Sequence, residues 1–332
     1  MAPLNLSQAP QRILAIVVTR IGDTLLCTPA LRALKQRWPE AELTVWAHPK
    51  RMEVLAGLPF INHLAGYTPW RRLSTHLPGT GRFDLAVVFS DEPAQIDVAL
   101  RAAESVLAFS GKALAGPRLT LVPQPACHAV MARLALLSPL AIVTDDHRLA
   151  YRVSPEETAW AARFVADMGS PLIVLQLHSF PTKAHRDWPF AHFEQLVTRL
   201  RQDYPAANFV VTGDHLAADS AARLRERCGA FVHSAAGKLS LRQTAALLAQ
   251  ADLYIGVDTG PTHLAGAVGV PMVGMYHAAY PGRNLSPLQH ARGRFIEHPL
   301  TACENARTAD MADISVDTVW QAANALLELK KS

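Results

Sequence analysis

This chain of 332 residues has few cysteines, few charged residues and no long hydrophobic run. Its four cysteines, Cys27, Cys127, Cys228 and Cys303, lie far apart and form neither a CxxC pair nor a Cys/His ligand spacing. The spacing therefore favours neither a disulfide framework nor a zinc site, and a reduced cytosolic setting is expected. No segment approaches the ~20 consecutive apolar residues that a membrane-spanning helix needs.

Charge is scarce and nearly balanced. Charged residues make up 18% of the chain, with 32 Lys and Arg against 28 Asp and Glu, and the pI is about 9.0. This small positive excess fits an anionic substrate or membrane surface, but it is too small to indicate nucleic acid as a partner. Because half of the residues are hydrophobic, a chain of this length is predicted to form about two well-packed domains.

Several motifs of catalysis are also missing. The chain has no GxGxxG after a strand and no GxxxxGK[ST], which removes the main support for nicotinamide-binding and P-loop enzymes. It has no DxD, HExxH or GxSxG motif and no clustered His/Cys set, so we expect no bound catalytic metal. The first residues, MAPLNLSQAPQ, lack a charged start followed by an apolar core, so we expect no secretion signal and a cytoplasmic location.

The pattern that is present alternates short β-branched runs with amphipathic stretches, as in parallel sheets covered by helices on both faces. In the first half we predict strands at 13–18, 43–47, 85–89 and 106–109, helices at 25–37, 49–55, 93–102 and 127–137, and a long loop at 66–82. In the second half we predict strands at 172–177, 209–212, 231–234, 253–257 and 272–276, and helices at 190–202, 217–228, 241–249 and 262–268.

The pattern changes around residues 140–154, where Ser154, Pro155 and Glu157 form a capped helix start. We therefore predict an α/β protein with Rossmann-like domains at 1–153 and 154–314 and a final helix within 315–332. Ligands of such sheets bind beyond the carboxyl ends of the strands. Three loops lie at such ends, and if the two halves oppose each other they line one cleft: residues 19–24, 178–188 and 258–260.

The most informative segment is YIGVDTGPTHLAGAVGVP, residues 254–271. Asp258, Thr259 and Gly260 form a turn after a predicted strand, and Pro261 stands where a helix tolerates a missing N–H. The following helix therefore presents free backbone amides and the positive end of its dipole to an anion such as a diphosphate. A purely structural strand-to-helix cap explains the turn equally well.

Four other side chains have a functional and a structural interpretation. Asp23 lies in the turn that opens the first helix, and its carboxylate either caps that helix or takes a proton from a sugar hydroxyl. Lys183 and Arg186, in the loop HSFPTKAHRDW, either neutralise phosphates or belong to a solvated basic loop. His263 lies one turn into the helix after the turn at 258–260 and is either a packing residue or a catalyst.

Three segments together resemble glycosyltransferase family 9, the bacterial ADP-heptose:lipopolysaccharide heptosyltransferases. They occur in the family's order and read RIGDTLLCTPALRALKQRWPEAELTV, HRDWPFAHFEQLVTRL and AGKLSLRQTAALLAQADLYIGVDTGPTHLAGAVGVPMVGMY. The resemblance implies a GT-B architecture, with two Rossmann-like domains facing a central cleft and a C-terminal helix that packs back on the N-terminal domain. It also implies an inverting, metal-independent transfer of heptose from ADP-heptose to the lipopolysaccharide core.

The resemblance also assigns roles to residues. Asp23 matches the general base, in an N-terminal domain that binds the acceptor. The C-terminal domain binds the donor, and the family's Lys two residues before the Trp-Pro pair is Arg186 here, so either Arg186 or Lys183 contacts phosphate. The acidic residue that binds the donor ribose is either Asp214 or Asp219. The expected donor-binding residues are thus Lys183, Arg186, Asp258, Thr259, Gly260 and His263.

The implied acceptor is lipid A with its core oligosaccharide, reached by peripheral contact with the cytoplasmic face of the inner membrane. Arg71 and Arg72, in the predicted loop at 66–82, are expected to contact this phosphorylated lipid. One departure concerns the donor pocket: where many members have Gly-Pro, this chain has residues 277–280, HAAY. The alternatives are transfer from another nucleotide sugar, or a nucleotide-sugar epimerase or hydrolase on the same scaffold.

Overall fold

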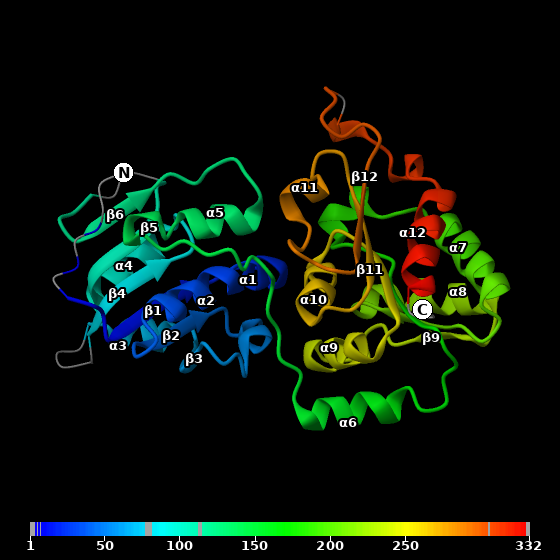
Figure 1. The fold of residues 1–332 in the computed structure, drawn as a ribbon, viewed down its shortest axis with the longest axis horizontal. Coiled ribbons are helices and arrows are strands. Elements are labelled where there is room, and N and C mark those ends of the chain that lie inside the picture. Colours follow the sequence, from blue (N-terminus) through cyan, green and yellow to red (C-terminus); the bar gives the residue numbers. More distant parts are fainter. Residues whose placement is uncertain are drawn as a thin grey trace. The chain divides into compact units, whose positions relative to one another are not determined.

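The computed structural model forms two compact units, Met1–Arg152 (unit 1) and Val153–Ser332 (unit 2), shown in Figure 1. Each unit contains a six-stranded parallel sheet, and the two sheets have the same strand order, β3-β2-β1-β4-β5-β6 and β9-β8-β7-β10-β11-β12. This is the order of Rossmann folds, so the predicted pair of Rossmann-like α/β sheets is confirmed. The structure describes residues 4, 6, 8–76, 82–111, 115–304 and 306–329.

Unit 1 has near-continuous apolar strands, because helices cover its sheet and leave little of it to solvent. Its strands are β1 (Arg12–Val17), β2 (Glu42–Ala47), β3 (His63–Gly66), β4 (Phe83–Val88), β5 (Ala103–Phe109) and β6 (Leu119–Val122). Its helices are α1 (Ile21–Leu26), α2 (Thr28–Arg37), η1 (Met52–Leu55), α3 (Pro69–Ser74), α4 (Pro93–Ala102), α5 (Ala129–Ala135) and η2 (Ser138–Leu140). The edge strands β3 and β6 were not predicted, because four-residue segments carry little periodic signal.

The single helix predicted at 25–37 is in fact two helices, α1 and α2, which meet at Cys27. Pro29 lies in the first turn of α2 and has no N–H to donate to the carbonyl of Leu25. The hydroxyl of Thr28 donates to that carbonyl instead, at 2.6 Å. The carbonyl of Leu25 therefore keeps a partner at the break, which separates the short helix that carries Asp23 from the longer one.

The loop predicted at 66–82 contains a helix, α3. Its N-terminus has two local signals that favour a helix: the Thr68 side chain accepts a hydrogen bond from the backbone N–H of Arg71, and Pro69 stands in the first turn. The proline and glycine content of the segment favours a loop, but the cap at Thr68 is the local signal that decides its structure. Residues 77–81, which belong to the same predicted loop, lie outside the described residues.

Unit 2 has helices on both sides of its sheet; Figure 1 shows α7, α8 and α12 on one side and α9 and α10 on the other. Its strands are β7 (Leu172–Gln176), β8 (Asn208–Thr212), β9 (Val232–Ser234), β10 (Leu253–Val257), β11 (Met272–Tyr276) and β12 (Gly293–Glu297). Its helices are α6 (Pro155–Phe164), η3 (Pro181–Arg186), α7 (Phe190–Asp203), η4 (His215–Ala217), α8 (Ala218–Cys228), α9 (Leu241–Gln250), α10 (Gly260–Val268), α11 (Gly282–Leu285), η5 (Ala306–Thr308), η6 (Met311–Asp313) and α12 (Val316–Glu328).

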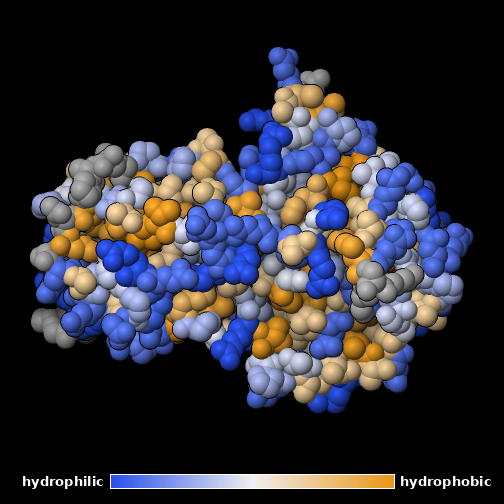
Figure 2. Space-filling model, viewed as in Figure 1, coloured by the Kyte–Doolittle hydropathy of each residue, from blue (hydrophilic) through white to orange (hydrophobic). Residues whose placement is uncertain are grey.

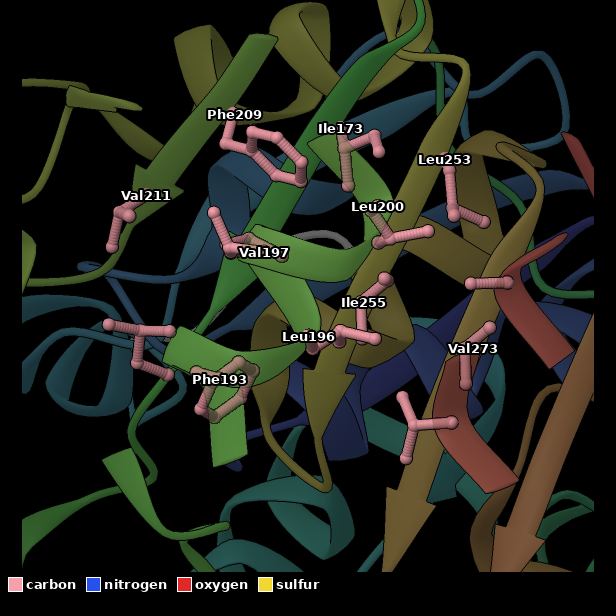
Figure 3. Packing of buried hydrophobic residues seen from close by; sticks show 14 of the residues in the cluster. Ile173, Phe193, Leu196, Val197, Leu200, Phe209, Val211, Leu253, Ile255 and Val273 are labelled. Atoms are coloured by element: carbon pink, nitrogen blue, oxygen red, sulfur yellow. The ribbon is translucent and has the colours of Figure 1, made fainter. Parts of the chain in front are cut away.

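Two features of unit 2 explain its stability. The predicted cap of α6 is confirmed, since Ser154 and Glu157 exchange hydrogen bonds between side chain and backbone in a capping box. Figure 3 shows Leu196 and Leu200 of α7 among apolar side chains of the strands, including Ile255. Full burial of one such side chain contributes about 1.5–3 kcal/mol, which fixes the helix on the sheet.

The C-terminal helix α12 packs on the sheet of unit 2, and a return of this helix to the N-terminal domain stays a prediction. Its apolar face, formed by Val319, Ala323, Leu326 and Leu327, belongs to the same buried cluster as the strands of the second sheet. On its polar side, the indole N–H of Trp320 donates to Asp203 at the end of α7, at 2.7 Å. The apolar stripe of α12 is therefore already buried within its own unit.

In the described part of the chain, no helix is long and apolar enough to cross a membrane. On the face seen in Figure 2, hydrophobic residues lie in separate small areas among hydrophilic ones. Of the large apolar side chains that are exposed, two lie close together in sequence on α3: Trp70 and Leu73, which are 77% and 57% exposed.

Candidate functional site

The order of the second sheet brings two of the predicted loops together. Strands β7 and β10 are neighbours, with Gln176 opposite Gly256, and the chain continues from them to opposite edges of the sheet. Loops beyond the carboxyl ends of two such strands flank the crevice in which α/β sheets bind ligands. The loop after β7 is the basic loop at 178–188, and the loop after β10 is the turn at 258–260.

A buried ion pair joins these two loops. Nη1 of Arg186 donates to Oδ2 of Asp258 at 2.6 Å, and the two side chains are only 14% and 5% exposed. Either charge alone would be costly at this depth, so each depends on the other. Of the two phosphate candidates, Arg186 is the one that contacts Asp258, and Lys183 makes no ion pair within the described residues.

Tyr280 covers the face of Arg186. Cζ of Arg186 lies 3.6 Å from the ring centroid of Tyr280, and Nζ of Lys183 lies 5.6 Å from the same centroid. A hydrogen bond from Arg186 and the charge of Lys183 lower the pKa of the Tyr280 phenol. Our sequence reasoning did not select Tyr280 as a site residue; the only signal for it was the unusual HAAY segment.

The N-terminus of α10 has backbone amides without a side-chain cap. Thr259 is the N-cap residue, but its hydroxyl donates back to the carbonyl of Val257, at 3.3 Å, and makes no hydrogen bond to the helix. Asp258 is occupied by Arg186, and Gly260 and Pro261 form the first turn. A side-chain cap therefore does not account for this turn. Pro261 has no N–H, and those of Thr262 and His263 donate to the carbonyl of Thr259, so the N–H of Gly260 and the helix dipole are what this end offers an anion.

His263 lies on the buried side of the same turn. Its Nε2 is 3.8 Å from Oδ1 of Asp258, and the side chain is buried in α10. The imidazole is therefore adjacent to the Arg186–Asp258 pair and packs within the helix layer, and its role in donor binding stays a prediction.

The loop that carries Arg186 is held in place by Asp187. The carboxylate of Asp187 accepts from the backbone N–H of Ser179 at 2.6 Å and lies 3.1 Å from Nδ1 of His178. The next residue, Trp188, is buried and donates its indole N–H to the carbonyl of Ile314 at 2.8 Å. These contacts fix the backbone on the C-terminal side of Arg186, and only Trp188 had a signal in the sequence, through the family's Trp-Pro pair.

The two ribose candidates follow β8, next to β7 in the sheet. Asp214 caps η4 by accepting from the backbone N–H of Leu216 at 3.0 Å. Asp219 is exposed in the first turn of α8. Neither makes a hydrogen bond or ion pair to Arg186 or Asp258 in the described structure, so the choice between them stays a prediction.

In unit 1, Asp23 lies after β1, whose neighbours β2 and β4 mark the corresponding switch point of the first sheet. The N-cap of α1 is Arg20, and Asp23 does not cap the helix. Its Oδ1 instead accepts from Nη2 of Arg133 in α5, at 2.7 Å, and the two side chains are 41% and 14% exposed. Sequence reasoning missed Arg133, because nothing local links residues 110 positions apart.

Cys27 is close to Asp23 but is not a nucleophile. Its thiol donates to the backbone carbonyl of Asp23 at 3.3 Å, and it is fully buried. Burial raises the pKa of this thiol to about 11, so the reactive thiolate is not formed near neutral pH.

Arg71 and Arg72, the predicted acceptor-binding residues, lie side by side in α3. Cζ of Arg71 is 5.5 Å from the Trp46 ring centroid, and Cζ of Arg72 is 5.8 Å from that of Tyr67. Neither guanidinium forms an ion pair among the described residues. The structure thus places two cationic groups beside the exposed Trp70 on one short helix.

Solved structures share this fold. A glycosyltransferase family 9 protein from Veillonella parvula DSM 2008 has a TM-score of 0.82 at 20% identity, covering 96% of this chain and 97% of that one. The ADP-heptose LPS heptosyltransferase II of E. coli has a TM-score of 0.77 at 20% identity, covering 97% and 100%. A more distant one, TibC, is an iron-containing dodecameric heptosyltransferase, with a TM-score of 0.57 at 13% identity over 96% of this chain and 76% of that one.

The metal-independence expected from the sequence stays a prediction. Over residues 8–76, 82–111, 115–304 and 306–329, no group of three or more His, Cys, Asp or Glu side chains is placed to hold a metal ion.

Sequence comparisons identify the family. Lipopolysaccharide heptosyltransferase 3 of Escherichia coli is 25% identical over 286 residues, which is 77% of this chain and 81% of that protein. The model of glycosyltransferase family 9 (heptosyltransferase) matches residues 108–309, more than half of the chain. This chain is therefore a glycosyltransferase and belongs to glycosyltransferase family 9.

Proposed function

We propose that this glycosyltransferase transfers heptose from ADP-heptose to the lipopolysaccharide core, with inversion and without a metal ion. The observation that carries the proposal is the buried Arg186–Asp258 pair beside the N-terminus of α10, which has no side-chain cap, at the switch point of the second sheet. The names of the related heptosyltransferases support heptose as the sugar.

The donor's diphosphate binds at the N-terminus of α10, where the helix dipole and the N–H of Gly260 attract negative charge. Arg186 has donors beyond the one used by Asp258, and it neutralises both that carboxylate and the adjacent phosphate. Asp258 alone would repel the diphosphate, so the ion pair is what makes an acidic residue compatible with this position. Lys183 adds a second positive charge near Tyr280.

Asp23 acts as the general base. Arg133 holds its Oδ1 and leaves Oδ2 for the acceptor hydroxyl, whose proton it takes. The hydroxyl oxygen bonds to the anomeric carbon on the face opposite ADP, the bond from that carbon to the diphosphate oxygen breaks, and its electron pair leaves with ADP. Arg186 and the N-terminus of α10 stabilise the negative charge that develops on the leaving diphosphate.

This mechanism requires the donor and the acceptor hydroxyl to meet away from bulk water. We therefore expect the two units to close around both substrates. Small-angle scattering with and without ADP together with a truncated lipopolysaccharide acceptor tests this expectation, since closure lowers the radius of gyration and an unchanged radius contradicts it.

The acceptor is lipid-anchored under this proposal, and α3 is where unit 1 meets the anionic membrane surface. Arg71 and Arg72 contact phosphates of lipid A and its core, while exposed Trp70 and Leu73 enter the interfacial layer. Vesicles of anionic lipid should bind the wild type, and Trp70→Ser with Leu73→Ser should release it. Val143→Ser, which removes a 91% exposed apolar side chain elsewhere in unit 1, is the matched control.

The decisive experiment is a donor screen by mass spectrometry with truncated lipopolysaccharide acceptors. The proposal expects one heptosyl unit on the acceptor and one ADP released for each transfer. Consumption of a nucleotide sugar without any acceptor would instead identify the epimerase or hydrolase alternative. Transfer from a different nucleotide sugar would retain the glycosyltransferase and reject heptose.

A further inference from the structure

Two departures of this chain from the family's sequence pattern meet in space. By the resemblance to glycosyltransferase family 9, Arg186 takes the position of a Lys, and Tyr280 ends the segment HAAY where many members have Gly-Pro. In the structure, Cζ of Arg186 lies 3.6 Å from the ring centroid of Tyr280. A planar guanidinium can stack on an aromatic face at this distance, whereas the ammonium group of a Lys offers no plane for stacking.

The guanidinium of Arg186 depends on this aromatic face. Nη1 bonds to Asp258, but Nε is buried and has no hydrogen-bond partner among the described residues. A guanidinium is weakly hydrated, so the π-face of Tyr280 offsets part of the cost of its burial. The carboxylate of Asp258 fixes one edge of the guanidinium, and the ring of Tyr280 fixes its plane.

The backbone under Tyr280 is itself anchored. The N–H of Tyr280 donates to the carbonyl of His277 at 2.8 Å. Nδ1 of His277 accepts from the N–H of Ala279 at 3.1 Å, and its Nε2 lies 3.0 Å from the carbonyl of Ala309, to which it donates. Because His277 is fully buried, these bonds anchor the backbone from which the ring of Tyr280 reaches Arg186.

We infer that Tyr280 is a positioning residue, which holds the plane of the Arg186 guanidinium so that its free donors meet the diphosphate of the donor nucleotide. The inference rests on the proposed function for the identity of that ligand. It makes Arg186 and Tyr280 one functional unit, in which neither residue retains its full contribution without the other.

The test measures the dissociation constant of ADP by calorimetry for variants at both positions. Tyr280→Leu keeps most of the volume but removes the π-face, and we expect ADP binding to weaken by about 3- to 30-fold. Tyr280→Phe keeps the ring and removes only the hydroxyl that Arg186 also contacts, so it should retain clearly more ADP affinity than the Leu variant. With ADP-heptose, the Leu variant should raise the donor KM more than it lowers kcat.

Coupling separates positioning from a general effect on the fold. In an Arg186→Lys background, Tyr280→Leu should change the ADP dissociation constant by less than about twofold, because the stacked guanidinium is already gone. If the two losses instead multiply, the inference is overturned. It is equally overturned if Tyr280→Leu binds ADP like the wild type, or if Tyr280→Phe is as weak as the Leu variant. Tyr280→Gln serves as a second ring-less variant if Tyr280→Leu does not fold.

The chain offers a matched control in unit 2. Arg199 stacks on Trp320 with the same 3.6 Å separation, between α7 and α12. Trp320→Leu should leave ADP binding unchanged. If this variant also loses ADP affinity, the effect at Tyr280 reflects general destabilisation, and the inference is overturned. If the wild type binds another nucleoside diphosphate instead of ADP, the proposed donor is wrong, but the same variants with that nucleotide still decide the role of Tyr280. If the wild type binds none, both proposals fall.

Discussion

Units 1 and 2 have the same strand order, and each places an Asp–Arg pair near its switch point, but the two pairs differ in depth. Asp23 with Arg133 keeps 41% of the carboxylate side chain exposed, whereas Asp258 with Arg186 leaves only 5%. An exposed carboxylate can exchange a proton with a substrate hydroxyl, while a buried one is held as part of a fixed charge arrangement. The same pair of residue types thus supports a base in one unit and a binding element in the other.

The connections after the strands explain this difference. In unit 1, only residues 18–20 separate β1 from α1, a short and mostly buried helix in which the side chain of Asp23 stays 41% exposed. In unit 2, residues 177–189 separate β7 from α7, and this longer connection, which includes η3, brings Arg186 over Asp258. Strand order therefore places both pairs near a switch point, and in unit 2 the longer connection covers the carboxylate with its cation.

The largest expected effect comes from removing the carboxylate of the Asp–Arg pair in unit 1. Asp23→Asn removes the proton acceptor and should lower kcat by about 10²- to 10⁴-fold, while ADP binding stays within about twofold of the wild type. Steady-state turnover and calorimetry check the two parts. Glu40→Gln, at an exposed carboxylate in the same unit, is the control. Turnover near that of the wild type would remove Asp23 as the base.

The second effect concerns stability and donor binding in unit 2. Arg186→Ala leaves the buried Asp258 without its counter-charge and should cost about 3–5 kcal/mol, together with a loss of ADP affinity. Lys183→Ala removes a charge without an ion pair, so it should leave the thermal midpoint unchanged and weaken ADP binding less. Thermal unfolding and calorimetry decide. Equal, negligible losses in both variants would reject both residues as phosphate ligands.

A smaller effect sharpens the comparison of the two pairs. Arg133→Gln should lower kcat by roughly tenfold, because Oδ1 of Asp23 loses the group that orients it. The thermal midpoint should fall less than for Arg186→Ala, since the carboxylate left behind remains in contact with water. If Arg133→Gln destabilises the protein as much as Arg186→Ala does, the difference in depth has no energetic consequence.

The smallest effect is a pH dependence in unit 2. Burial lowers the pKa of His277 below its ordinary value of 6.5, so its contribution to stability is complete above about pH 6.5 and is lost as the pH falls further. His277→Asn should reduce the fall in thermal midpoint between pH 7.5 and 5.5. One histidine changes the free energy of unfolding by at most about 1.4 kcal/mol per pH unit. His63→Asn, at an exposed histidine of unit 1, is the control, and an unchanged pH profile in the His277 variant contradicts the expectation.

Much of the architecture could be predicted because it depends on local patterns. Helix α4 has the predicted bounds, and the strands β7, β10 and β11 lie where apolar runs were found. The misses had identifiable causes. The apolar pattern predicted one helix across Pro29, where the structure has two. The prolines near Thr68 favoured a loop, although the Thr68 side chain caps a helix. For α12, amphipathicity showed that one face is buried but not which unit buries it.

The candidate site divides in the same way. From the sequence alone came the acidic turn at 258–260, the basic loop that contains Arg186, and Asp23 after the first strand, since each is a short motif next to a strand end. Tertiary structure alone decided that Arg186 pairs with Asp258, that Arg133 holds Asp23, and that Tyr280 covers the guanidinium. The first contact joins residues 72 positions apart and the second joins residues 110 positions apart. The third joins two different loops. Depth and pairing depend on how the chain packs around a residue, and no local pattern of residues contains that information.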